Sequence, residues 1–273
     1  MSNEQTTLPK NNISSPLVEQ KTSYTTPEEK LSMSSIQDLI KQSWPVYKSN
    51  FKKLIGMILL PMLAFIALGI LFLLLGVSGL FLFKDMGETG GLIIKVLFGM
   101  IALGGIIFGI IISVIAQAGL YILIKNSKEN ITVKEAFLRA KKIAGKFFAL
   151  NLLIGIFVML WSLLFIIPGI YMALMYSMAV WIFIYEDIRG TAAIKKSKEL
   201  VKGYWGAVFW RFLAVYLLFY LIIIIPSILF DNSGFEILWT IAAQVISFLA
   251  APFFMIYQCF MYWDLKRVKG NNQ

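Results

Sequence analysis

Long stretches without charged side chains constrain this chain more than any other feature. Residues 54–83 contain none, and neither do residues 147–185. About 20 apolar residues are enough for an α-helix to cross the hydrocarbon core of a membrane. Only helices and closed barrels satisfy their backbone groups in lipid, and runs such as residues 221–225 lack the alternation of a barrel strand. The sequence therefore predicts an all-α, polytopic membrane protein.

Six transmembrane helices in three hairpins, with amphipathic interfacial helices, are predicted within a membrane domain of residues 34–268. A polar segment, residues 1–33, precedes this domain and is predicted to be a flexible cytoplasmic tail, because it offers little apolar surface to bury. Pro168-Gly169 is predicted to be the turn between the third and fourth helices. The predicted spans are residues 54–83, 92–124, 147–167, 170–185, 207–230 and 237–263.

Amphipathic helices are predicted where the chain enters the odd-numbered spans. Residues 34–51 place apolar side chains near one face, with Pro45 predicted to kink or break the helix. Thr132 and Glu135 have the spacing of a capping box at the start of the second helix. Residues 190–203 form the third, which is basic. Helices with aromatic and lysine side chains are typical of the membrane interface.

The distribution of positive charge predicts the topology. Among 25 Lys and Arg residues, only Lys84 and Lys95 fall on the side opposite the termini. The positive-inside rule then places both termini in the cytoplasm of a multi-pass protein of the bacterial inner (plasma) membrane. The net charge of +10 therefore points to the membrane surface, and no nucleic-acid partner is expected.

The three hairpins also show a weak internal similarity. Ser43, Ala140 and Ser197 each precede an aromatic residue by eight positions, at the entry to an odd-numbered span. One interpretation is three parallel repeats, each an interfacial helix followed by a hairpin. The other is that any helix at this depth needs lysines and aromatic residues. Both interpretations stay open at the level of sequence.

The segment from Ile167 to Trp205 reads IPGIYMALMYSMAVWIFIYEDIRGTAAIKKSKELVKGYW. Its PGIY turn, apolar span, Glu-Asp pair and basic helix resemble the membrane domain found beside some bacterial glycerophosphoryl diester phosphodiesterases, and related uncharacterised six-span bacterial membrane proteins. The resemblance covers about residues 34–268 and implies a polytopic inner-membrane protein. That family's catalytic domain uses histidine, acidic residues and a divalent metal, so it is not expected in this histidine-free chain.

Residues that could carry chemistry are few. The single cysteine, Cys259, excludes an internal disulfide, and without histidine no metal-spaced cluster is present. We therefore expect no catalytic residue, no metal and no cofactor, and predict a non-enzyme. Glu186 and Asp187 could bind a metal or a headgroup. We favour a structural acid pair that forms ion pairs, because adjacent helical side chains diverge by about 100°.

Two basic faces are candidates for binding anionic lipid headgroups, although lysines that only fix topology would look the same. Each lysine near an anionic leaflet contributes about 1 kcal/mol. The candidate residues are Lys141, Lys142, Lys146, Lys195, Lys196, Lys198 and Lys202.

Small residues Gly105, Gly109 and Ser113 recur at four-residue spacing in the second span. They indicate close helix packing in preference to a pore wall or substrate groove. The favoured function is a non-enzymatic scaffold or lipid-interacting protein, with membrane lipids and a protein partner or second copy as its partners. The alternative is a transporter of a small or lipid-like molecule, with a site between repeats lined by Gln117, Asn151 and Gln244.

Overall fold

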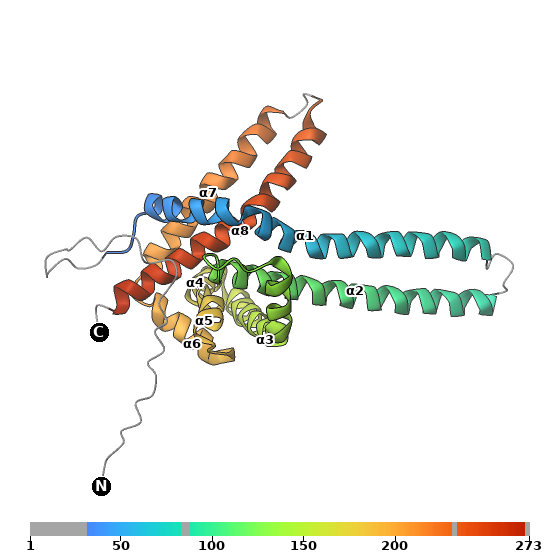
Figure 1. Ribbon diagram of the computed structural model, residues 1–273, viewed down its shortest axis with the longest axis horizontal. Coiled ribbons are helices and arrows are strands. Elements are labelled where there is room, and N and C mark those ends of the chain that lie inside the picture. The colour runs from blue at the N-terminus through green and yellow to red at the C-terminus, as the bar shows by residue number, and fades with distance from the viewer. Residues whose placement is uncertain (1–31, 83–87, 231–233, 271–273) are drawn as a thin grey trace, which may run out of the picture.

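A computed structural model describes residues 32–82, 88–230 and 234–270, and all the regular structure in these residues is α-helical (Figure 1). Six of its segments are long and apolar enough to cross a membrane, with α4 and α5 together forming one of them. The predicted all-α polytopic fold is confirmed. The helices are α1 (Ile36–Leu82), α2 (Glu88–Lys125), α3 (Val133–Leu164), α4 (Ile166–Tyr176), α5 (Ala179–Glu186), α6 (Gly190–Val201), α7 (Trp205–Leu229) and α8 (Glu236–Gly270).

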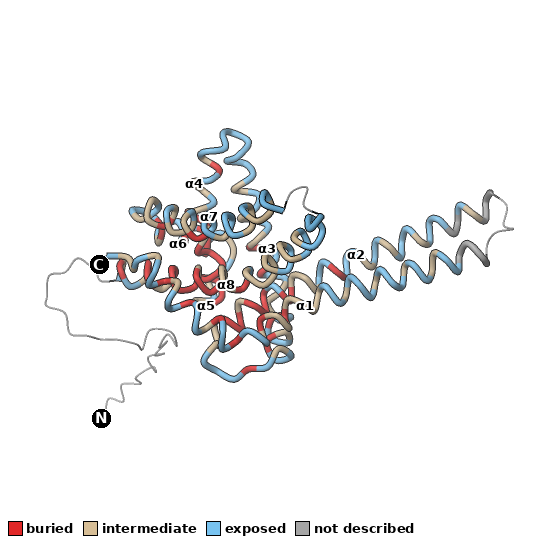
Figure 2. The backbone as a smooth tube through the Cα atoms, turned by 90° about the horizontal axis from the view of Figure 1, so that it is seen from above, coloured by how far each residue is buried: buried red, intermediate tan, exposed pale blue. Residues whose placement is uncertain are grey.

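The predicted tail is almost entirely outside the described residues, as are residues 83–87 and 231–233, which belong to two of the predicted connections. The described helices pair as three hairpins, α1 with α2, α3 with α4, and α7 with α8. These hairpins meet at one end of the molecule and point away from one another at the other (Figures 1 and 2). We call the shared end the basic end: α1, α3 and α7 begin there, and α2, α5 and α8 end there.

Buried residues are concentrated at the basic end, whereas the outer parts of the hairpins are largely exposed (Figure 2). Trp181, Tyr262 and Phe147 are among the largest fully buried side chains. Lipid covers apolar helices without help from protein, so the hairpins have no need to pack along their whole length. The packing at the basic end is what holds the three hairpins in one molecule.

The first and second predicted interfacial helices are not separate elements. The predicted helix of residues 34–51 continues directly into the first span as α1, and α3 likewise includes its own interfacial segment. The break predicted at Pro45 does not occur. Pro45 is exposed near the start of α1, so water can hydrogen-bond the carbonyl that this proline leaves unpaired. The capping box of Thr132 and Glu135 is confirmed.

The predicted turn at Pro168-Gly169 is wrong by a few residues. The chain turns at Phe165, whose extended backbone (φ −160°, ψ 149°) separates α3 from α4. Pro168 lies in the first turn of α4. Backbone N–H groups in the first turn have no partner within the helix, so the N–H that proline lacks costs no hydrogen bond. Gly169 lets α4 approach α3, because a Cβ atom there would lie 2.9 Å from the Cα of Ser162. The fourth span therefore begins earlier than predicted.

That span is also broken, which the sequence did not predict. Helix α4 ends at Tyr176 and α5 begins at Ala179. The Ser197 hydroxyl, from α6, donates to the carbonyl of Met175 (2.8 Å) and accepts from the amide of Met178 (3.1 Å). Side chains from two other helices therefore replace backbone bonds lost at the break, because Gln258 of α8 also donates to the carbonyl of Ser177 (2.8 Å).

Each interfacial segment packs on the helix that ends the preceding hairpin. Helix α3 contacts α2, α6 contacts α4 and α5, and α1 contacts α8, which closes the cycle. The small residues at equivalent positions, Ser43, Ala140 and Ser197, are all fully buried. This shared burial supports the hypothesis of three repeats. The third hypothetical repeat differs from the other two because a turn at Gly203 (φ 90°) separates α6 from α7.

Candidate functional site

The first basic face lies on α3. Ala136, Ala140 and Phe147 point into the core at helical spacing. The lysines between them, at positions 141, 142 and 146, are exposed. Burial of one side of a helix leaves the other side to solvent or to headgroups, so this face presents its ammonium groups outward.

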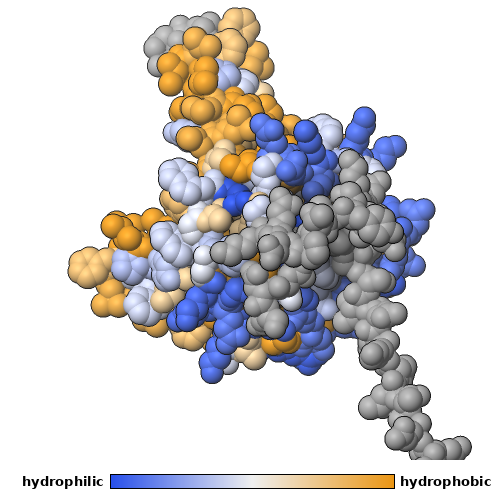
Figure 3. Space-filling view, turned by 90° about the vertical axis from the view of Figure 1, so that its left-hand side faces the viewer, coloured by the Kyte–Doolittle hydropathy of each residue, from blue (hydrophilic) through white to orange (hydrophobic). Residues whose placement is uncertain are grey.

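The second basic face lies on α6, which contacts α3. Its buried side consists of Ala193, Ile194, Ser197 and Val201. Lysines 195, 196, 198 and 202 are exposed on the opposite side. Hydrophilic side chains gather over the basic end, while the protruding hairpins are hydrophobic (Figure 3). The structure therefore brings the two predicted basic faces onto neighbouring helices.

Glu186 and Asp187 do not act together. The Glu186 carboxylate, only 13% exposed, pairs with Lys196 (2.5 Å) and Lys266 (3.0 Å), and accepts from the hydroxyl of Tyr262 (2.7 Å). Asp187, 71% exposed, takes a left-handed backbone conformation (φ 51°) and pairs with Arg189 at 2.8 Å. Glu186 thus connects α5 to α6 and α8, whereas Asp187 closes the end of α5 on the surface.

These ion pairs divide the seven candidate lysines. Lys196 is neutralised by Glu186, whereas the other six form no ion pair within the described part of the chain. Unpaired ammonium groups remain available to an anionic ligand. Among the described residues there is also no group of three His, Cys, Asp or Glu side chains that could hold a metal ion. The arrangement is suited to binding phosphate groups.

Replacing Glu186 with glutamine is expected to lower the free energy of unfolding by about 1 kcal/mol. The effect stays modest because Lys196 and Lys266 are 48% and 39% exposed and water can solvate them. Asp187→Asn is the matched control and is expected to change stability by less than about 0.5 kcal/mol, since its pair is on the surface and Asn tolerates a left-handed backbone. Thermal unfolding of both variants in mild detergent measures the difference. Equal stability of the two variants would contradict a connecting role for Glu186.

Sequence reasoning missed several polar residues at the basic end. Asp264 accepts from the amide (2.7 Å) and the hydroxyl (2.8 Å) of Ser34 and pairs with Arg267. Arg211 donates to the carbonyls of Ser34 and Met33. These contacts tie the start of α1 to α7 and α8. Apart from the local Asp264–Arg267 pair, the partners are more than 170 positions apart, so no local pattern could have revealed these contacts.

Gly105 and Gly109 lie against α1. A Cβ atom at Gly109 would approach the ring of Phe65 to 2.4 Å, and one at Gly105 would approach Phe72 to 3.2 Å. The hydroxyl of Ser113 donates to the carbonyl of Gly109 within its own helix (2.8 Å). The two glycines therefore permit close packing of α1 on α2, as small residues commonly do in membrane helices.

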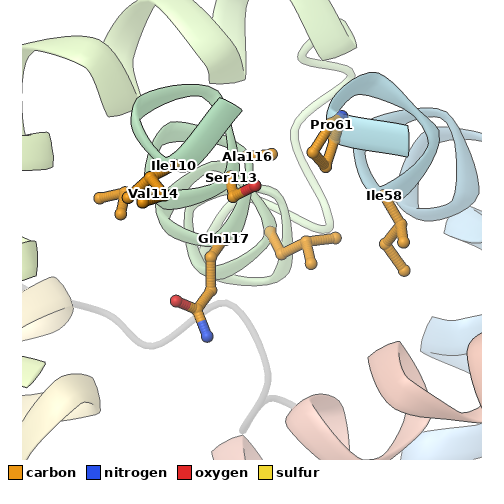
Figure 4. A pocket seen from close by; sticks show the side chains of 8 residues that line it. Ile58, Pro61, Ile110, Ser113, Val114, Ala116 and Gln117 are labelled. Carbon is orange, nitrogen blue, oxygen red and sulfur yellow. The ribbon is translucent and has the colours of Figure 1, made fainter. Parts of the chain in front are cut away.

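The three residues predicted to line a transport site are not brought together in one pocket. Gln117 lies in a groove between α1 and α2 that does not include Asn151 or Gln244 (Figure 4). The amide of Asn151 donates to the carbonyl of Phe147 in its own helix. Gln244 is exposed on α8. Gln117 therefore lines this groove without the other two residues.

Comparison with known proteins gives one match. The model of a family described as "Domain of unknown function (DUF8558)" matches residues 137–266, slightly less than half of the chain. The match begins inside α3 and ends inside α8, so the α1–α2 hairpin lies outside it. No curated protein and no solved structure matches the chain. Similarity to this family carries no function, and the resemblance to the phosphodiesterase-associated membrane domain stays a prediction.

Proposed function

We propose that this chain is a non-enzymatic, lipid-interacting protein of the bacterial inner membrane that gathers anionic lipid headgroups at its basic end. In this proposal the basic end faces the cytoplasm, in line with the positive-inside rule. The observation that carries the proposal is a set of six exposed lysines on the neighbouring helices α3 and α6, Lys202 at the C-cap of α6 included, that form no ion pair with any described residue. Lipid phosphates lie at the depth where these helices enter the membrane.

The packing of the basic end favours this function over transport. Aromatic side chains from three helices fill the centre: Tyr121 contacts Trp181 with ring centroids 4.7 Å apart, and Tyr185 stacks on Tyr262 at 5.7 Å. A closed, aromatic core of this kind is expected of a scaffold or lipid-binding protein, because a transport path needs an opening on each side of the membrane in turn. The broken fourth span is the feature that keeps transport as the second candidate, since such breaks occur at transporter binding sites.

Replacing four of the unpaired lysines with glutamine is expected to weaken binding of an anionic lipid at least tenfold, because each lysine contributes about 1 kcal/mol. The protein, purified in mild detergent, is titrated with dioctanoyl phosphatidylglycerol and with dioctanoyl phosphatidylcholine, and bound lipids are counted by native mass spectrometry. The substituted residues are Lys141, Lys142, Lys195 and Lys198.

A matched control removes the same number of positive charges from elsewhere on the basic end. Its substituted residues are Lys41, Lys48, Lys52 and Lys128, all exposed and all outside α3 and α6. The proposal expects this control to retain most of the binding, with membrane topology unchanged in both variants. Equal loss in the two variants would indicate a general charge effect, and unchanged binding in the first would rule out the proposed lipid surface.

A further inference from the structure

The second helices of the three hairpins share a pattern near the basic end. Residues 116–125, 176–185 and 257–266 read AQAGLYILIK, YSMAVWIFIY and YQCFMYWDLK. Each segment has a polar residue at its second position and an aromatic ring four residues later. The polar residues are Gln117, Ser177 and Gln258, and the rings are Tyr121, Trp181 and Tyr262.

The three rings belong to the aromatic core. Trp181 and Tyr262 are fully buried, and Tyr121 packs on Trp181. Four residues correspond to about one helical turn, or 6 Å along the axis. The polar residues therefore lie one turn deeper in the membrane than the rings that close the basic end.

Two of the three polar positions are joined in the fold, and one is not. Gln258 donates its amide to the carbonyl of Ser177 across the interface between α8 and the broken span. Gln117 is exposed, and its amide forms no hydrogen bond with any described residue. Figure 4 shows this amide extending away from α2, clear of Pro61 and Ile58. The Gln117 amide of the first hairpin is therefore without a hydrogen bond to any described residue, whereas the Gln258 amide at the corresponding depth of the third hairpin is hydrogen-bonded.

The surroundings of Gln117 limit what can bind there. It lies in a groove of about 390 Å³, a size in the range of small-molecule sites, between Ile58 and Pro61 of α1 and Val114 and Leu120 of α2. None of the described residues that line the groove is charged. Gln117 precedes Lys125, the last residue of α2, by eight positions, or about 12 Å of helix. An unpaired amide at this depth is unfavourable unless a ligand satisfies it.

We propose that this groove binds a neutral lipid with a small hydroxyl head, of the monoacylglycerol or diacylglycerol class. The hydroxyl exchanges hydrogen bonds with the Gln117 amide, which offers both a donor and an acceptor. The acyl chain lies against the apolar wall formed by α1 and α2. A phosphate group is excluded because the groove has no cation to offset its charge, whereas an uncharged head can enter the hydrocarbon layer at lower free-energy cost.

The experiment measures binding of tritiated monooleoylglycerol to the full chain in phosphatidylcholine nanodiscs, with oleoyl lysophosphatidate as the charged counterpart of equal chain length. Gln117→Leu is the test variant, and it should fold normally because the amide has no hydrogen-bond partner among the residues that the structure describes. Gln244→Leu is the matched control: an exposed glutamine on α8, outside the groove. We expect saturable binding of monooleoylglycerol that Gln117→Leu weakens about tenfold and Gln244→Leu leaves unchanged.

Three results would overturn the proposal: no saturable binding of monooleoylglycerol, equal binding of monooleoylglycerol by wild type and Gln117→Leu, or binding of lysophosphatidate that Gln117→Leu weakens as strongly as it weakens monooleoylglycerol binding. Lysophosphatidate held by the lysine surface is unaffected by this substitution. A Gln117→Leu variant with altered oligomeric mass and intact lipid binding would instead assign the amide to a contact between two copies. The site is independent of the lysine surface, so the quadruple lysine variant should bind monooleoylglycerol normally. Failure of one proposal is thereby distinguishable from failure of the other.

Discussion

Replacing Ser197 with alanine is expected to lower the free energy of unfolding by about 2–4 kcal/mol, an unusually large effect for the loss of one oxygen atom. The Ser197 hydroxyl is fully buried and bonds two backbone groups at the break between α4 and α5, the carbonyl of Met175 and the amide of Met178. Alanine leaves both groups without this partner in the core, and a buried unsatisfied group costs about 1–3 kcal/mol. Unfolding in mixed micelles, followed by circular dichroism as dodecyl sulfate is added, measures the change.

Ser43→Ala is the matched control for this substitution. Ser43 occupies the corresponding position in the first of the three hypothetical repeats and is also fully buried, but among the described residues its hydroxyl bonds only the carbonyl of Leu39 in its own helix. The corresponding residue in the second hypothetical repeat is already an alanine, Ala140. The control is therefore expected to change stability by less than about 1 kcal/mol. Equal effects of the two substitutions would show that the hydroxyl of Ser197 has no special role at the break.

Replacing Gly169 with alanine is expected to destabilise the protein by about 2–3 kcal/mol, even though alanine favours helix by about 1 kcal/mol. The added Cβ atom would lie 2.9 Å from both the Cα and the Cβ of Ser162. Because one of these is a backbone atom, α4 has to move away from α3. The same dodecyl sulfate titration measures the loss of stability.

Gly155→Ala provides the control within the same hairpin. Gly155 is an exposed residue of α3, and a Cβ atom there would meet nothing within 4 Å. This substitution is expected to be neutral or to stabilise the protein by up to about 1 kcal/mol. Destabilisation of similar size by both variants would contradict the close packing of α3 on α4.

The helices themselves were predictable because their signals are local. A run such as residues 54–83 has no charge to place in water, so it must be a helix in lipid. The capping box of Thr132 and Glu135 is likewise a contact over three positions. The predicted turn at Pro168-Gly169 failed for the opposite reason. Both residues are allowed in the first turn of a helix. Gly169 is placed there because, lacking a Cβ atom, it lets α4 pack closely against Ser162 of α3.

The candidate site was predictable only in part. The exposure of Lys141 and Lys198 follows from helical spacing, since the residues on the opposite face of each helix are apolar or small. The partners of Glu186 do not follow from any spacing. Lys266 and Tyr262 lie about 80 positions further along the chain and reach Glu186 only because α5 and α8 pack together.

The sequence alone determined that this chain forms membrane-spanning helices joined as hairpins, with its positive charge collected at one end. Both properties depend on the free energy of transferring single side chains between water and lipid, which is a property of each residue by itself. Only the tertiary structure decided that the fourth span breaks, that Glu186 joins three helices and that Gln117 lies beside a groove without a hydrogen-bond partner in the described part of the chain. These features depend on hydrogen bonds and packing between distant segments, which exist only after the hairpins have assembled.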